Sequence, residues 1–153
     1  DAQESRGLGD VYKRQPLTRP GADPPTERNQ AMSTTATDTT TPAHPYSPAY
    51  AVAGFGFVSG ALSVDESGVA VDGIEPALDA AIARLSERLA TIDMTLGDVV
   101  KTTYFVTDVT LRDAANRHYE RIFDAPRPAR SFVEVAALPY GATVEIEAIA
   151  HVA

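Results

Sequence analysis

Arg130, Glu145 and Glu147, near the C-terminal end of the chain, have the types and spacing of a site for a small anion. Arg130 follows Pro128-Ala129, a pair that favours extended backbone. Its guanidinium is always charged and matches a carboxylate with two parallel hydrogen bonds. Glu145 and Glu147 share one face of a predicted strand, and a carboxylate beside a partly desolvated cleft can orient and deprotonate a water. These residue types predict acid–base chemistry on a small anionic substrate.

Each of the three residues also has a structural interpretation. Arg130 could form a surface salt bridge with one of the many acidic residues. Glu145 and Glu147 could lie on the solvated outer face of an edge strand. Spacing alone leaves these interpretations open, and it does not decide which glutamate would act.

The other residue types that carry chemistry are poorly placed. His44, His118 and His151 lack the spacing of metal ligands, and the chain contains no cysteine. Residues 54–56, Gly-Phe-Gly, are too short for a dinucleotide loop. We therefore predict neither a metal site nor a cofactor.

The composition limits the possible partners. The chain has 153 residues, a length typical of one domain, and 44% of them are hydrophobic. Residues 1–31 carry five acids and five bases, so residues 32–153 hold 16 of the 21 acids and 8 of the 13 bases. An acidic surface disfavours phosphate backbones, and no apolar run approaches membrane length. We therefore predict a protein that binds neither nucleic acid nor membrane. We also predict a cytoplasmic setting, since nothing in the sequence requires an oxidising compartment.

The first part of the chain differs in composition from the rest. Residues 1–45 are polar and rich in Pro and Thr, which predicts a disordered lead. Residues 5–15 look like translated upstream sequence, so residues 1–31 are suspected to be non-native. The folded domain is predicted to span residues 46–153.

Hydrophobic periodicity predicts an α+β fold with two helices on one face of a mixed sheet. A stripe of Leu and Ile at spacings of three and four predicts a helix over residues 75–92, and a second helix is predicted over residues 111–123. The predicted strands are residues 49–53, 55–59 with a continuation at 62–64, 69–71, 99–107, 130–135 and 144–151. The strand at 99–107 has apolar residues in both alternating sets, so we expect it to be buried on both faces.

Two helices cover only one face of such a sheet, so its other apolar face predicts self-association. If strands 130–135 and 144–151 pair as an antiparallel hairpin, Arg130 and Glu145 lie roughly 17 Å apart along the ladder. That is too far for one small molecule to touch both. We therefore expect a site shared across a subunit interface.

Segments along the whole domain resemble the YjgF/RidA family of reactive-intermediate or imine deaminases, over residues 46–152. The segments that carry the resemblance are Pro45-Tyr46-Ser47, Val58-Ser59-Gly60, residues 97–103, Asn116 with Tyr119, Pro128-Ala129-Arg130-Ser131, Leu138-Pro139 and residues 144–150. The resemblance implies a chorismate-mutase-like fold and a homotrimer with sites between subunits. It implies cofactor-free hydrolysis of 2-enamino or 2-imino acids, such as 2-iminopropanoate and 2-iminobutanoate, to 2-oxo acids and ammonium. Such an activity limits damage by reactive metabolites.

The resemblance also implies roles for individual residues. By motif position, Arg130 would bind the substrate carboxylate and Glu145, rather than Glu147, would activate the water. The residues that would line the pocket are Tyr46, Ser59, Gly60, Asn116 and, at the position after Ser131, Phe132.

Two positions depart from the family pattern. Ala61 replaces a common glutamine, and Phe132 replaces a common cysteine. If Phe132 faces the pocket, it narrows or alters the substrate range. Three alternatives therefore stay open: a non-catalytic carboxylate-binding or regulatory module, a deaminase of a different imine, and a ribonuclease or chaperone-like role. The net charge of −8 weighs against RNA.

Overall fold

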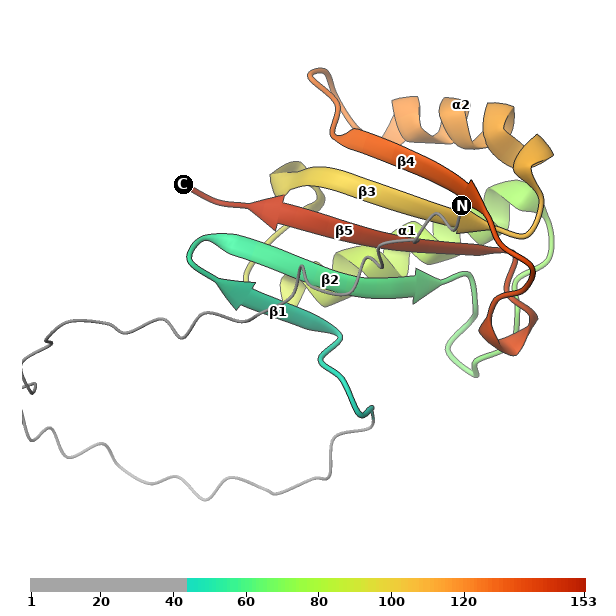
Figure 1. Ribbon diagram of the computed structural model, residues 1–153, viewed down its shortest axis with the longest axis horizontal. Coiled ribbons are helices and arrows are strands. Elements are labelled where there is room, and N and C mark those ends of the chain that lie inside the picture. The colour runs from blue at the N-terminus through green and yellow to red at the C-terminus, as the bar shows by residue number, and fades with distance from the viewer. Residues whose placement is uncertain (1–43) are drawn as a thin grey trace, which may run out of the picture. The chain divides into compact units, whose positions relative to one another are not determined.

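The computed structural model describes residues 44–153, which form a five-stranded mixed sheet with two helices on one face (Figure 1). The strands are β1 (Ala49–Val52), β2 (Phe55–Leu62), β3 (Val99–Val106), β4 (Ala129–Glu134) and β5 (Val144–His151). The helices are α1 (Ile74–Ala90) and α2 (Arg112–Ile122). The predicted fold class is confirmed. The predicted disordered lead, residues 1–45, lies outside the described residues except for residues 44 and 45. The suspected origin of residues 1–31 lies wholly outside them, and the domain boundary at residue 46 stays a prediction.

The sheet has the order β1-β2-β5-β3-β4. β1 and β2 form a hairpin through Ala53 and Gly54, whose φ angles of 50° and 79° give the twist that a two-residue turn requires. The expected continuation at 62–64 is split: β2 runs to Leu62, and Val64 makes a single bridge to Ala70. Nothing more of a strand forms at residues 69–71.

The predicted apolar stripe forms the buried face of α1. Leu78, Leu85 and Leu89 are all buried against the sheet. Gly73 occupies the cap position before the first turn, and Pro76 lies in that turn. The helix ends at Ala90 rather than at residue 92, because the chain turns there and Asp93 has a φ of 57°. None of the helices among residues 44–153 is long and apolar enough to cross a membrane.

The expected hairpin of residues 130–135 with 144–151 is wrong. β4 pairs in parallel with β3, and β5 lies between β2 and β3, antiparallel to both. The crossover from β3 to β4 runs through α2, as parallel strands require, and residues 135–143, between β4 and β5, carry the chain back past β3 to the centre of the sheet. β4 is therefore an edge strand, and Figure 1 shows β3 between it and β5.

β5 alternates as predicted. Val144, Ile146, Ala148 and Ala150 are buried beneath the helices, so Glu145 and Glu147 project from the opposite, open face. The expectation that β3 is buried on both faces is wrong for the single chain. Its residues Thr102, Tyr104 and Val106 are fully buried under the helices, while the residues between them are partly exposed.

The open face carries large apolar side chains. Tyr50 and Val52 of β1, Phe55 and Phe57 of β2, and Val133 of β4 are between 42% and 60% exposed. Their register partners place them on the side of the sheet away from the helices. The prediction of an apolar second face is confirmed for these residues, and its burial by self-association stays a prediction.

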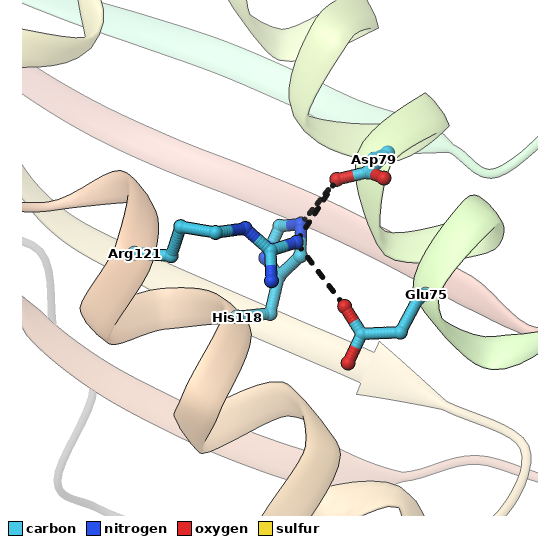
Figure 2. Close-up of polar contacts among 4 residues, drawn as sticks. All are labelled: Glu75, Asp79, His118 and Arg121. Atoms are coloured by element: carbon cyan, nitrogen blue, oxygen red, sulfur yellow. Dashed lines mark hydrogen bonds and ion pairs between the residues drawn. The ribbon is translucent and has the colours of Figure 1, made fainter.

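A polar cluster joins the two helices on the covered side (Figure 2). His118 of α2 is fully buried, and its Nε2 lies 2.9 Å from Oδ1 of Asp79 on α1. A carboxylate only accepts, so Nε2 carries the hydrogen. Arg121 also donates to Glu75 (3.1 Å) and to Asp79 (3.4 Å), but these groups are about half exposed. The bond between His118 and Asp79 is the one that satisfies a fully buried group.

We predict that Asp79→Ala lowers the free energy of unfolding by about 1–3 kcal/mol, because it leaves the buried Nε2 of His118 without its acceptor. Glu75→Ala is the matched control. It removes only an exposed ion pair and should cost less than about 1 kcal/mol. Urea unfolding of both variants measures the difference, and equal losses would contradict the role assigned to His118.

Candidate functional site

The predicted site residues form two groups on the folded chain. The Arg130 group consists of Arg130, Asn116 and Phe132, together with Tyr104 and Tyr119. The Glu145 group consists of Glu145, Ser59 and Gly60, the neighbouring segment at Tyr46, and Arg88.

Arg130 lies on the covered side of β4, against α2. Its Nη2 donates to Oδ1 of Asn116, and its Nη1 lies 3.5 Å from the carbonyl oxygen of Ala115. These two contacts use one N–H of each terminal nitrogen, so three of the five donors of the guanidinium have no partner among the described residues. Arg130 is therefore held in place without a carboxylate partner among the described residues, unlike the surface salt bridge that was the alternative interpretation.

Three aromatic rings surround the Arg130 guanidinium. Its central carbon lies 5.0 Å from the ring centroid of Tyr119, 5.3 Å from that of Phe132 and 5.4 Å from that of Tyr104. Contacts of this kind stabilise a cation and fix its plane. Phe132 also stacks on Tyr104 with centroids 6.1 Å apart, so the two rings pack together against the guanidinium of Arg130.

Tyr104 adds an unusual feature beneath this arginine. Its ring is fully buried, and its hydroxyl has no hydrogen-bond partner among residues 44–153. Burial strongly raises the pKa of Tyr104, so the hydroxyl stays neutral. Tyr119, in contrast, donates to the carbonyl oxygen of Pro128 (3.1 Å) and thereby ties α2 to the start of β4.

The Glu145 group is built on a bulge in β2. The register of β2 with β5 shifts between Val58 and Ala61, so Ser59 and Gly60 interrupt the ladder. Glu145 lies directly over Gly60, and its carboxylate occupies the space that a Cβ at that position would fill. Glycine is therefore required here for a close approach. The Oγ of Ser59 donates a hydrogen bond to the carbonyl oxygen of Ser47 (2.8 Å) and so holds the segment that precedes β1.

Burial raises the pKa of Glu145, and the neighbouring Glu147 adds to this rise. The positive charge of Arg88 acts in the opposite direction and lowers the pKa. A glutamate whose pKa lies above the ordinary value is a stronger base once ionised, which suits the activation of water. Glu147, in contrast, is exposed.

Arg88 was not found from the sequence. It lies in the last turn of α1, and Nη1 donates to the carbonyl oxygens of Ser59 and Gly60, both at 2.8 Å. A cation near a helix C-terminus is common, so its type and position gave no functional signal.

Arg130 and Glu145 lie on opposite faces of the sheet within one chain. Arg130 is level with Thr102 and Ala148, whose side chains are buried beneath the helices, whereas Glu145 projects from the open face. Three residues along the strand and two strand spacings across separate their Cα atoms by roughly 14 Å. The hairpin expected from the sequence was wrong, but the separation that it gave was of similar size. One small molecule cannot contact both groups of the same subunit.

The described residues form a separate cavity of about 430 Å³ on the open face. Tyr50, Phe57, Lys101 and Glu147 line it, and Ser59 is the one predicted site residue among its walls. Neither Arg130 nor Glu145 reaches this cavity. Among residues 44–153, no group of His, Asp or Glu is arranged to hold a metal ion.

This fold and these two groups define a RidA-like α+β domain. The sequence model of the family described as Endoribonuclease L-PSP matches residues 36–152, and the chain therefore belongs to that family, which is the YjgF/RidA family. The predicted membership is confirmed.

Known proteins support the assignment. A crystal structure of an endoribonuclease, described as putative, from Thermotoga maritima is 41% identical, with a TM-score of 0.68 over 73% of this chain and 90% of that chain. The 2-iminobutanoate/2-iminopropanoate deaminase of Capra hircus is 39% identical over 109 residues, which are 69% of this chain and 79% of the relative. Reactive Intermediate Deaminase A, chloroplastic, of Arabidopsis thaliana is 37% identical over 108 residues, 69% of this chain, and the chain spans only 58% of that relative.

We predict that Glu147→Gln lowers the pKa of Glu145, because the substitution removes a like charge that now raises it. Titration of the Glu145 side chain by carbon-detected NMR measures the change. Glu87→Gln serves as the control, since Glu87 acts on Arg88 and not directly on Glu145. An unchanged or higher pKa of Glu145 in Glu147→Gln would contradict the described arrangement.

Proposed function

We propose that this protein hydrolyses reactive 2-imino acids, and their 2-enamino tautomers, to 2-oxo acids and ammonium. Arg130 of one subunit binds the carboxylate, and Glu145 of a neighbouring subunit activates the water. The observation that carries the proposal is the pairing of a preorganised arginine fork with a carboxylate of raised pKa in a family that includes named imine deaminases. 2-Iminopropanoate and 2-iminobutanoate are the proposed substrates.

The chemistry needs few protein groups. The protonated imine has an electrophilic carbon next to its carboxylate, and Arg130 fixes that carboxylate with two hydrogen bonds. Glu145 accepts a proton as the water oxygen bonds to this carbon, which gives a tetrahedral carbinolamine. The protonated Glu145 returns a proton to the nitrogen. The carbon–nitrogen bond then breaks as Glu145, ionised again, removes the proton of the hydroxyl group, so that the carbon–oxygen bond becomes the carbonyl of the 2-oxo acid. The ammonia that leaves takes up this proton as ammonium, and Glu145 is again a carboxylate.

A homotrimer is the proposed assembly. The apolar open face, with Tyr50, Phe55, Phe57 and Val133, supplies surface that association would bury. Opposite placement of the two groups supplies a second reason, because a cyclic assembly can bring the Arg130 group of one copy to the Glu145 group of the next. Tyr46, Ser59 and Gly60 then line one side of each site, and Asn116 and Phe132 line the other.

The alternatives predict different behaviour. A non-catalytic module would bind a stable 2-oxo acid through Arg130 without turning over an imine. A deaminase of another imine would owe its different substrate to the two departures from the family pattern, Ala61 and Phe132. The family description and the Thermotoga structure mention endoribonuclease, but the excess of acidic residues disfavours RNA. The cytoplasmic location of this protein stays a prediction. One relative is named chloroplastic.

We predict that Arg130→Ala lowers kcat/KM for 2-iminopropanoate by roughly 30- to 4,000-fold, which corresponds to about 2–5 kcal/mol for a truncated charge pair. A coupled assay, in which a dehydratase generates the imine from serine or threonine, measures it. Arg127→Ala, three residues earlier and exposed, is the matched control and should retain wild-type turnover. Equal rates for wild type and Arg130→Ala would refute the assignment.

A subunit-mixing experiment tests the shared site. Arg130→Ala and Glu145→Gln chains are refolded together in equal amounts. If each site takes Arg130 and Glu145 from different subunits, every mixed trimer contains one intact site. A random mixture should then recover about one quarter of wild-type activity. Native mass spectrometry confirms mixing, and mixed trimers without activity would sink the shared-site proposal.

A further inference from the structure

We infer that Arg88 is a positioning residue for Glu145. By holding the carbonyl oxygens of Ser59 and Gly60, its guanidinium fixes the bulge over which the Glu145 carboxylate lies. The inference rests on the proposed function for its kinetic consequence, but its structural part can be tested without turnover.

The geometry links α1 to the site in two steps. Nη1 of Arg88 lies 2.8 Å from each of the two carbonyl oxygens, so one donor group spans both bulge residues. Gly60 in turn has the Glu145 carboxylate against its Cα, with no room for a side chain. Any movement of the bulge therefore moves the surface on which Glu145 rests.

A bulge needs such a restraint. It interrupts the ladder between β2 and β5, so its carbonyl groups lose the partners that regular strand residues have. Hydrogen bonds from a charged donor are roughly twice as strong as neutral ones, and a rigid guanidinium loses less entropy than a flexible amine. Arg88 thus replaces the missing ladder bonds from the covered side of the sheet.

The charge of Arg88 has a second effect on the same carboxylate. It lowers the pKa of Glu145, against the larger effect of burial and the smaller one of Glu147. Tyr46, Arg84 and Glu87 are the other titratable groups that act on Arg88 itself. Removing the charge of Arg88 should therefore raise the pKa of Glu145. As the pH falls, Glu145 would then lose its active, ionised form at a higher pH than it does in the wild type.

Arg84 provides a matched control one helical turn earlier. Its Nη2 also donates to two carbonyl oxygens, those of Val64 and Asp65, both at 3.1 Å. These belong to the segment after β2, and Arg84 is not among the charges that shift the pKa of Glu145. Arg84 and Arg88 thus share residue type, helix and kind of bond, and differ in the segment that they hold.

The experiment compares Arg88→Gln, Arg88→Lys and Arg84→Gln with the wild type. Arg88→Gln should lower kcat/KM for 2-iminopropanoate by about 10- to 100-fold, with most of the loss in kcat, because the carboxylate is displaced rather than removed. The acidic limb of the pH profile should move to higher pH. Arg88→Lys keeps the charge and should return the limb to its wild-type position, with partial recovery of kcat. Arg84→Gln should stay within about twofold of wild type.

NMR separates failure of this inference from failure of the proposed function. If the wild type turns over no imine, the titration of Glu145 and the amide shift of Gly60 still report the effect of Arg88. Arg88→Gln should move both, and Arg84→Gln should move neither. Equal effects of the two Gln variants, or an unmoved titration of Glu145 in Arg88→Gln, would overturn the positioning role and leave Arg88 as a structural residue.

Discussion

The parallel pairing of β4 with β3 is the constraint on which the candidate site depends. It keeps β4 at the edge of the sheet, two strands from β5, and sets Arg130 level with Thr102 and Ala148 on the side covered by the helices. β5 alternates with its apolar residues under the same helices, so Glu145 must project from the other side. The single chain therefore holds both groups firmly and keeps them apart. A second copy is the means by which a small substrate could meet both.

Each half of the proposed site is held in place by the local fold. Arg130 is fixed by α2 through Asn116 and by aromatic rings from β3, β4 and α2, which leave part of its fork for an anion. Glu145 is fixed from below by Gly60, and its raised pKa follows from burial. Arg88 connects this second half to α1. Because the halves are rigid separately, catalysis would depend mainly on how accurately the subunit contact aligns them.

The sequence predicted the features that depend on local periodicity. The leucine stripe of α1 and the alternation of β5 follow from repeat spacings of 3.6 and 2 residues, and both were found. Strand pairing was missed, because nothing local distinguishes a hairpin from a parallel partner reached through α2. Arg88 was missed because its partners are backbone oxygens 28 and 29 residues away. Phe132 was singled out by its position in the motif of the resembling family, but its stacking on Tyr104 and Arg130 needed the register of β4.

The central claim is that the Arg130 of one subunit and the Glu145 of another act on one substrate. A crystal structure with pyruvate, an unreactive 2-oxo acid of the same shape as the proposed substrate, tests it most directly. We expect the pyruvate carboxylate to bind the Arg130 fork of one copy, with the pyruvate carbonyl carbon facing Glu145 of a neighbouring copy. Pyruvate bound in the open-face cavity beside Glu147, or held by Arg130 far from any Glu145, would contradict the account.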